Sequence, residues 1–87
     1  MQLSVIILNY NVRYFLEQCV LSVQEAISGL DAEIIVVDNN SSDDSCLMMK
    51  TRFPEVKLIE NKENFGFPKG NNIAVNQAGG KYICILN

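Results

Sequence analysis

The sequence contains no histidine and no tryptophan, and its three cysteines show no Cys-x-x-Cys spacing. Histidine is the commonest general base and metal-ligating side chain, so its absence leaves acid, base and metal chemistry in this segment to carboxylates. Glycine is also missing from the turn after the first apolar run, where Asn9, Tyr10 and Asn11 stand. Glycine-rich nucleotide loops need it there so that backbone amides approach phosphate closely. The sequence therefore argues against a phosphate site of that type.

The charge balance and the lengths of the apolar runs limit the classes of partner that this single small domain is expected to bind. Ten acidic residues outnumber seven basic ones, which are scattered rather than gathered in a patch, and the net charge is −3. This balance argues against a nucleic-acid partner. The apolar runs are all far shorter than the roughly 20 residues of a membrane span. We expect a globular α/β domain with no transmembrane segment in this stretch.

The cysteines indicate a cellular compartment. Cys19, Cys46 and Cys84 are odd in number and lie within apolar, periodic segments. Free cysteine in such segments is typically a buried, reduced thiol. Reduced thiols indicate a reducing compartment. The expected location is the cytoplasm, including the inner face of the membrane.

The most informative stretch runs from Ile34 to Asp44. It begins with four apolar β-branched residues and continues directly into Asp38 and a cluster of Asn, Ser and Asp. An apolar run without polar alternation is typical of a strand covered on both faces of a parallel sheet. In open α/β sheets, ligands bind outside the carboxyl ends of the strands. The pattern therefore predicts a buried strand that presents Asp38 to a ligand.

The same pattern recurs along the chain, with helical features between the apolar runs. Residues 4–11, 34–38, 56–60 and 81–87 are expected to be strands. A β-α-β-α-β-α-β alternation is typical of a Rossmann-like, three-layer α/β fold whose strands are mainly parallel and flanked by helices. We predict the strand order 3-2-1-4, with the weakest run, residues 56–60, near an edge.

Local signals locate the helices between these strands. Asn11 is expected to cap the first helix, with Glu17 on its polar side. Its apolar stripe is formed by Phe15, Leu16, Cys19, Val20, Val23, Ala26 and Ile27. The second helix is expected over residues 43–52, with its acidic residues at the positive end of the dipole. Pro68 suits the first turn of the third helix, and glycines at 79 and 80 end it.

Asp38 and the neighbouring Tyr10 each have two interpretations. An aspartate after a buried strand is often a helix cap or an Asx-turn former. Alternatively, its carboxylate accepts the ring N–H of a uracil or thymine, an edge that cytosine does not offer. Tyr10 either stacks on such a base or is a half-buried core aromatic. The residues alone leave both alternatives open.

The loop at residues 61–72 offers a weaker candidate site. Gly66 and Gly70 are either turn positions or part of a backbone nest for an anion. Phe65 and Phe67 are expected to anchor the loop, and Lys69 to be solvated. Without a glycine-rich cradle, a diphosphate would need a divalent metal held by carboxylates.

Four motifs follow one another along the whole chain, at residues 5–11, 35–43, 64–72 and 80–87. In this order and at this spacing they resemble the amino-terminal half of a glycosyltransferase family 2 enzyme of the GT-A fold. The Asn-Phe-Gly-Phe at 64–67 and the Gly-Asn-Asn at 70–72 resemble the rhamnosyltransferase-like branch. That branch is found in bacterial surface-polysaccharide synthesis.

The resemblance implies inverting transfer of a sugar from a UDP or dTDP donor to a glycan or lipid-linked acceptor. Residues 1–87 would be the nucleotide-binding part of a partial GT-A domain. The residues that the resemblance assigns to the nucleotide pocket are Leu8, Asn9, Tyr10, Asp38, Asn40 and Asn71.

The resemblance also implies what this segment lacks. The family's metal-binding motif, its acceptor site and its catalytic base follow the fourth strand, beyond residue 87. We therefore assign no catalytic or metal-binding residue here and expect Mn²⁺ or Mg²⁺ in the longer protein only. Transfer needs both the base and the cation, so this segment alone is expected to be inactive.

Other classes of protein compete with this interpretation. The missing glycine-rich loop argues against a nucleotidyltransferase-like domain, and Asn9 and Asn11 replace the acidic pair of a receiver-like module. A non-catalytic nucleotide-binding or interaction module remains the alternative. Strand edges and helix faces without a cover would also favour self-association.

Overall fold

The computed structural model describes residues 1–86, which form alternating strands and helices. The elements are β1 (Leu3–Asn9), α1 (Arg13–Ala26), β2 (Ala32–Asp38), α2 (Ser45–Arg52), β3 (Lys57–Glu60), α3 (Phe67–Gln77) and β4 (Tyr82–Leu86). The predicted alternation is therefore confirmed, while Asn87, the expected last residue of the fourth strand, lies outside the described residues. None of the helices in residues 1–86 is long and apolar enough to cross a membrane.

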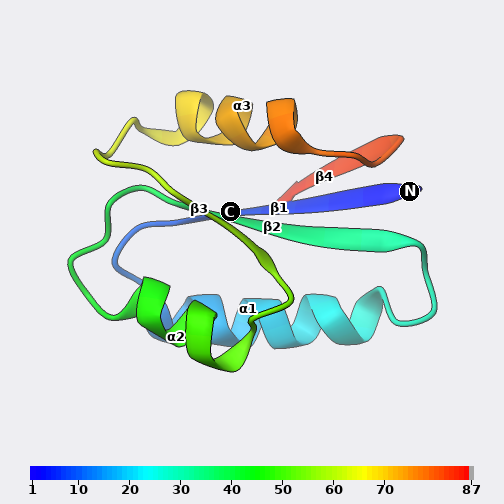
Figure 1. Ribbon diagram of the computed structural model, residues 1–87, viewed down its shortest axis with the longest axis horizontal. Helices are drawn as coiled ribbons and strands as arrows, with labels where there is room; N and C mark the ends of the chain where they lie inside the picture. The colour runs from blue at the N-terminus through cyan, green and yellow to red at the C-terminus, as the bar shows by residue number, and fades with distance from the viewer. Residues whose placement is uncertain (87) are drawn as a thin grey trace.

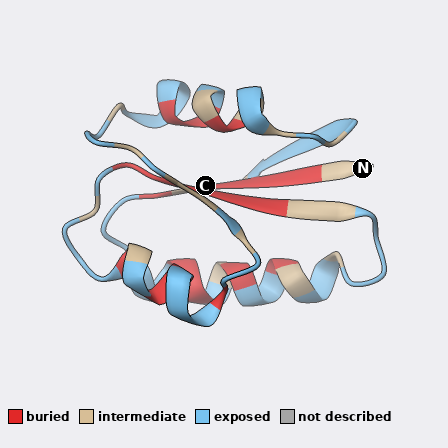
Figure 2. Ribbon diagram, viewed as in Figure 1, coloured by how far each residue is buried: buried red, intermediate tan, exposed pale blue. Residues whose placement is uncertain are grey.

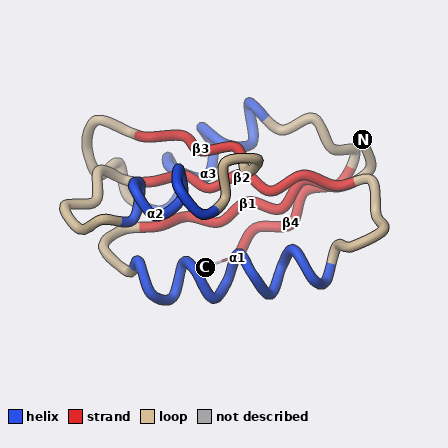
Figure 3. Tube along the Cα trace, turned by 60° about the horizontal axis from the view of Figure 1, so that its bottom comes forward, coloured by secondary structure: helices blue, strands red, loops and turns tan. Residues whose placement is uncertain are grey.

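The four strands form one parallel sheet in the order β3-β2-β1-β4, which confirms the predicted order. Figure 3 shows the strands side by side, with β1 and β2 in the middle. Helices α1 and α2 cover one face and α3 covers the other, which gives three layers (Figure 1). In the register of the central pair, Asn9 lies opposite Asp38 and Ser4 lies opposite Glu33.

The core is divided between the two faces of the sheet. The larger cluster lies under α1 and α2 and contains Val5, Ile7, Leu16, Val20, Val23, Ile34, Val36, Met48, Met49 and Phe53. The smaller cluster lies under α3 and contains Ile6, Ile35, Val37 and Ala74. Because both faces of the central strands are covered, successive residues of β1 and β2 are buried (Figure 2), which explains their continuous apolar runs.

Strand β4 is the least covered strand, and it corrects the prediction for one cysteine. Within residues 1–86 it pairs only with β1, and four of its five residues are exposed (Figure 2). Cys84 is exposed for this reason, so the expectation of a buried thiol was wrong there. Cys19 and Cys46 are half-buried, and all three thiols are free.

The start of α1 also differs from the prediction. Val12 rather than Asn11 precedes the helix, and no side-chain hydrogen bond caps it. Asn11 has a φ of 53° and turns its side chain toward the loop after β2 instead. Phe15 is 72% exposed rather than buried. In contrast, Glu17 is buried, because it pairs with Arg52 of α2.

Helix α2 begins two residues later than predicted. Asp43 lies before the helix, where its carboxylate accepts hydrogen bonds from the backbone N–H of Ser45 (2.9 Å) and of Arg13 (3.2 Å). An aspartate that satisfies backbone N–H groups in this way favours a turn over a helix interior. The basic residues Lys50 and Arg52 stand in the last turn, as predicted.

Candidate functional site

The candidate site lies at the carboxyl ends of the two central strands. Asn9 ends β1 and Asp38 ends β2, and parallel register places them opposite each other. Their exposed fractions are 1% and 2%. Asn9 Nδ2 donates a hydrogen bond of 2.8 Å to Asp38 Oδ1. A buried carboxylate is therefore held at the edge of the sheet where α/β domains bind ligands.

The carboxylate of Asp38 also binds the loop that follows it. Its Oδ2 accepts the Ser41 backbone N–H at 2.8 Å, and its Oδ1 accepts the Ser41 hydroxyl at 2.7 Å. The first of these bonds is the local turn that the structural interpretation of Asp38 predicted. With the bond from Asn9, the two Ser41 bonds order the carboxylate and use three of its roughly four acceptor positions.

The thiol of Cys46 adjoins the same carboxylate. Burial, together with hydrogen bonding to Asp38 and Glu60, raises the pKa of the Cys46 thiol to about 12. The thiol is therefore protonated at neutral pH and is only a weak donor. The raised pKa leaves little Cys46 thiolate for nucleophilic chemistry at neutral pH.

Tyr10 and Leu8 flank Asn9 and differ in exposure. Tyr10 is 48% exposed and lies outside both core clusters, and its stacking on a base stays a prediction. Tyr10 directly follows Asn9 in the chain, so its exposed side chain starts from the end of β1. Leu8 is half-buried and contacts the smaller core cluster. The structure thus brings four of the predicted site residues to one edge of the sheet.

Helix α3 approaches this edge closely at Gly70. A Cβ atom at Gly70 would lie 2.7 Å from Leu8 Cδ1 and 3.2 Å from Asn39 Nδ2. Gly66 precedes the helix with a φ of 78°, a conformation that glycine adopts without strain. Both glycines therefore have structural roles, and Asn71 follows Gly70 as a buried residue of α3.

Two residues of the site were missed by the sequence analysis. Asn39 is buried, donates a hydrogen bond of 3.1 Å to the Gly66 carbonyl, and accepts one of 2.8 Å from Asn61 Nδ2. It ties the β2 end to the loop before α3. Ser41 binds Asp38, as described above. The polar cluster after Asp38 was the available signal, but it did not indicate which members turn inward.

Asn40 and Lys69, in contrast, lie on the surface. Asn40 is exposed with a φ of 65°, a left-handed conformation that asparagine tolerates better than most residues. Lys69 is exposed, as expected, and its Nζ lies 4.3 Å from the centre of the Phe65 ring. This contact is a cation–π interaction. Phe65 is half-buried and anchors the loop, whereas Phe67 is exposed.

The surface has a hollow at each end of the sheet. A hollow of about 370 Å³ lies at the other end of the sheet, between the end of α1, β2 and the start of β3. A hollow of about 90 Å³ adjoins the site and is lined by Ile7, Leu8, Asn9, Val12, Phe15, Leu16 and Cys19. Neither of these hollows is lined by Asp38 or Tyr10, so we place the site by the buried Asn9–Asp38 pair and not by the volume of a hollow.

The metal-binding capacity of the described residues is limited. Among residues 1–86, no three or more Asp, Glu, Cys or His side chains lie close enough together to hold a metal ion. The donor set present here therefore does not fit a divalent metal, and we assign no step to one in this segment.

The fold and the edge of the sheet on which the polar groups converge define a GT-A-like α/β domain. The chain matches the family model described as glycosyl transferase family 2 over residues 4–87, and it belongs to that family. The resemblance seen in the sequence is thereby confirmed.

Two curated relatives carry names of glycosyltransferases. The chain is 33% identical over 90 residues to the GalNAc(5)-diNAcBac-PP-undecaprenol beta-1,3-glucosyltransferase of Campylobacter jejuni, covering 99% of this chain and 29% of that protein. It is 30% identical to the dolichol-phosphate mannosyltransferase of Pyrococcus furiosus, covering 100% of this chain and 25% of that protein. The chain thus spans about a quarter of the length of these relatives.

Solved structures share the fold. TarS of S. aureus, residues 1–349 in complex with UDP, superposes with a TM-score of 0.83 at 26% identity, covering 99% of this chain and 27% of that one. The mannosyltransferase PcManGT of Pyrobaculum calidifontis, in complex with GDP-Man and Mn²⁺, has a TM-score of 0.80 at 24% identity. The alignment covers 94% of this chain and 26% of that one, and it shows the fold alone.

Proposed function

We propose that this chain is the nucleotide-binding part of a glycosyltransferase that uses a UDP or dTDP sugar. One observation carries the proposal: the buried, hydrogen-bonded Asn9–Asp38 pair lies beside the exposed Tyr10 at the ligand-binding edge of the sheet. The TarS structure, which contains UDP, supports the choice of nucleotide. We propose no nucleic-acid partner, because the chain carries a net charge of −3.

The proposed pocket recognises the base by hydrogen bonding and stacking. Asp38 accepts the ring N–H of uracil or thymine at the acceptor position that the weakly donating Cys46 thiol uses in the unliganded chain, and Tyr10 stacks on the base. Leu8 and Asn9 line the pocket, and Asn71 approaches it from α3. Asn40 is the weakest member, because it is exposed at the turn between Asp38 and Ser41.

The remaining parts of the reaction belong to the longer protein. In the proposed inverting transfer, a base deprotonates the acceptor hydroxyl, and a divalent metal such as Mn²⁺ or Mg²⁺ supplies charge stabilisation to the departing diphosphate. Residues 1–86 hold no set of ligands for that ion. We place both functions beyond residue 87 and expect this segment alone to be inactive.

The acceptor is proposed to be a glycan or lipid-linked sugar of bacterial surface polysaccharide synthesis. The Campylobacter jejuni relative, whose name specifies an undecaprenol-linked acceptor, supports this class. Such a reaction would take place in the cytoplasm, at the inner face of the membrane. The three free thiols are consistent with a reducing compartment.

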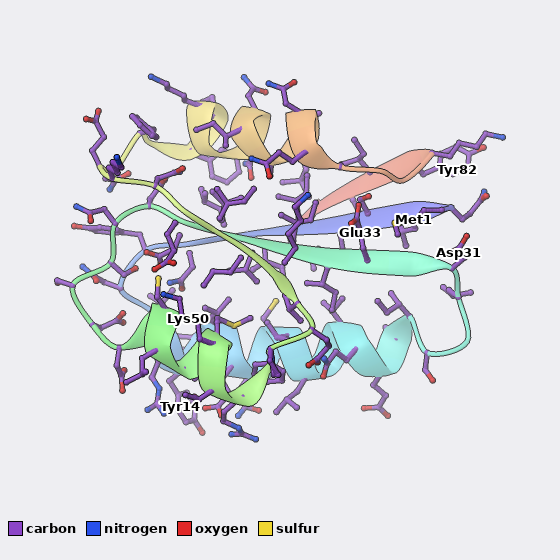
Figure 4. The ribbon with its side chains drawn as sticks, in the orientation of Figure 1. Met1, Tyr14, Asp31, Glu33, Lys50 and Tyr82 are labelled. Carbon is purple, nitrogen blue, oxygen red and sulfur yellow. The ribbon has the colours of Figure 1, made fainter. Side chains whose placement is uncertain are left out.

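The test is a titration of this polypeptide with UDP, dTDP and CDP, followed by amide chemical shifts. We expect UDP and dTDP to bind more tightly than CDP, and Asp38→Ala to weaken UDP binding about tenfold or more. Asp38→Asn keeps the shape of the side chain but loses the charge, and we expect this variant to bind UDP more weakly as well. Asp31→Ala serves as the control, because Asp31 is exposed at the opposite end of the sheet (Figure 4). Equal UDP binding by the Asp38→Ala and Asp31→Ala variants would contradict the assigned pocket.

Self-association through β4 is a second proposal, favoured by the exposed apolar side chains of this edge strand. Tyr82, Ile83 and Ile85 are exposed on β4, which has an unpaired edge within residues 1–86. A second copy would bury them by pairing strand to strand. Sedimentation at increasing concentration is expected to show dimers or larger species, and a monomer at all concentrations would contradict this.

A further inference from the structure

The hydroxyl group of Ser41 occupies a central position in the site. Ser41 is half-buried, and its Oγ donates to Asp38 Oδ1 at 2.7 Å. The same oxygen accepts the backbone N–H of Asn11 at 2.8 Å and Asn9 Nδ2 at 3.3 Å. One hydroxyl therefore makes three hydrogen bonds, which uses its single donor and both of its acceptor positions.

These bonds join the loop after β1 to the loop after β2. Asn11 directly follows Tyr10, so the bond to its backbone N–H holds the segment that carries the aromatic ring. Asn11 Oδ1 adds a bond of 2.7 Å from the backbone N–H of Ser42. The other end of the connection is the Asp38 carboxylate. Ser41 thus links the residues that form the two sides of the base pocket.

We propose that Ser41 is a positioning residue that sets the distance between the Asp38 carboxylate and Tyr10, and so determines selectivity for uracil and thymine over cytosine. The inference rests on the proposed function, in which Asp38 and Tyr10 contact the base. Ser41 itself need not touch the nucleotide. Its effect is transmitted through Asp38 on one side and through the Asn11 backbone on the other.

The alternative is a purely structural role, and the hydrogen-bond pattern separates the two. Replacing Ser41 by alanine removes the three hydroxyl bonds but keeps the bond from the Ser41 backbone N–H to Asp38. The turn itself is therefore retained, while the carboxylate loses one donor and the Asn11 N–H loses its acceptor. Such a change is expected to loosen the relative position of the two loops without removing either of them.

The test compares Ser41→Ala with Ser41→Thr and with the neighbouring Ser42→Ala. Threonine retains the hydroxyl, whereas Ser42 is exposed and its Oγ makes only a bond of 3.4 Å to Asn11 Oδ1. Hydrogen exchange of the Asn11 amide in the unliganded chain is expected to be about tenfold faster in Ser41→Ala and unchanged in Ser42→Ala. Equal exchange rates in these two variants would overturn the proposed link. Thermal unfolding first establishes that each variant is folded.

Nucleotide selectivity then tests the consequence of the link. We expect the ratio of UDP to CDP affinity to fall about tenfold in Ser41→Ala, to be restored in Ser41→Thr, and to keep the wild-type value in Ser42→Ala. General destabilisation would weaken the binding of UDP and of CDP equally and leave the ratio of their affinities unchanged. A retained ratio in Ser41→Ala overturns the role of Ser41.

The same data distinguish failure of this inference from failure of the proposed function. If the wild-type chain shows no preference for UDP over CDP, the proposed base contact of Asp38 fails, and the selectivity role of Ser41 fails with it. If the wild-type chain prefers UDP and Asp38→Ala loses that preference while Ser41→Ala retains it, only the role of Ser41 is wrong.

Discussion

Each end of the β1–β2 pair carries a carboxylate of β2 opposite a polar residue of β1. At the amino end Glu33 lies opposite Ser4, and at the carboxyl end Asp38 lies opposite Asn9. Both pairs are hydrogen-bonded. The ends differ in what else they bind, and this difference separates a structural network from a candidate binding site.

The amino-end network is satisfied by the chain itself. Glu33 Oε2 accepts the Ser4 hydroxyl at 2.6 Å and the Gly79 backbone N–H at 2.8 Å, and Ser4 Oγ accepts the Gly80 N–H at 2.8 Å. Figure 4 shows Glu33 at the end of the sheet where β4 begins at Tyr82. The network therefore attaches the connection between α3 and β4 to the centre of the sheet.

The carboxyl end has buried polar atoms that lack partners. Within residues 1–86, three buried side-chain atoms accept or donate no hydrogen bond: Asn9 Oδ1, Ser45 Oγ and Asn71 Oδ1. Asn9 ends β1, Ser45 begins α2, and Asn71 is the fifth residue of α3. Buried polar groups are normally paired. Unused hydrogen-bonding capacity is what a ligand site requires, and none of these buried unpaired atoms in residues 1–86 belongs to the Ser4–Glu33 network.

The largest expected effect comes from crowding the amino-end network. A Cβ at Gly80 would lie 2.5 Å from the Ser4 backbone nitrogen and 2.6 Å from the Leu3 carbonyl carbon. We expect Gly80→Ala to lower the free energy of unfolding by about 3 kcal/mol, because backbone atoms must move. A Cβ at Gly79 would lie 3.7 Å from its nearest neighbour, so Gly79→Ala is the matched control. Equal chemical-denaturation midpoints for the two variants would refute the close approach.

A smaller effect, opposite in sign at the two ends, comes from removing polar groups. Ser4→Ala leaves the Gly80 N–H without its acceptor and Glu33 without one of its two donors, and it should destabilise the chain by about 1–2 kcal/mol. Asn71→Leu removes a buried acceptor that lacks a donor and should stabilise the unliganded chain by up to about 1 kcal/mol.

The same Asn71→Leu variant should bind UDP more weakly than the wild-type chain. Urea unfolding measures the change in stability of the Ser4→Ala and Asn71→Leu variants relative to the wild-type chain. UDP titration of the same proteins measures the change in affinity. Destabilisation by Asn71→Leu would show that Asn71 belongs to a satisfied network after all.

The smallest expected effect is a pH dependence at the amino end. The Ser4 hydrogen bond, followed by the Gly79 hydrogen bond, lowers the pKa of Glu33 below its ordinary value of 4.5. Lys57 and the amino terminus act in the same direction. A lowered folded-state pKa stabilises the chain above the unfolded-state value, and this contribution is lost as pH falls through the folded-state pKa.

Glu33→Gln tests this pH dependence. The difference in unfolding free energy between the wild-type chain and this variant should be constant from pH 7 to about pH 5 and should shrink below about pH 4.5. Measurements of unfolding at stepwise lower pH check this. A difference that grows as the solution is acidified would contradict the direction of the pKa shift.

Much of the fold could be predicted from the sequence. Apolar runs, helical spacing and turn formers define elements through local chemistry, and short connections between parallel strands restrict their order. The order β3-β2-β1-β4 and the position of Asn9, Tyr10 and Asp38 at strand ends followed from these rules. Such features depend on residues close together in the chain.

The errors arose where long-range contacts outweigh local pattern. Phe15 fits the apolar stripe of α1 but is exposed, whereas Glu17 fits the polar side but is buried, since Arg52 of α2 supplies the opposite charge. Cys84 fits a buried strand, yet β4 is an edge strand. In each case the environment is provided by an element elsewhere in the sequence.

The sequence alone determined the class of fold and which strand ends carry polar residues, because both depend on local periodicity and composition. Only the tertiary structure decided which of those residues act together. The hydroxyl of Ser41 meets Asn11, and the hydroxyl of Ser4 meets Glu33, across separations of 30 and 29 residues. These contacts depend on the register of two parallel strands and on side-chain orientation within ångströms, which no local pattern of residues specifies.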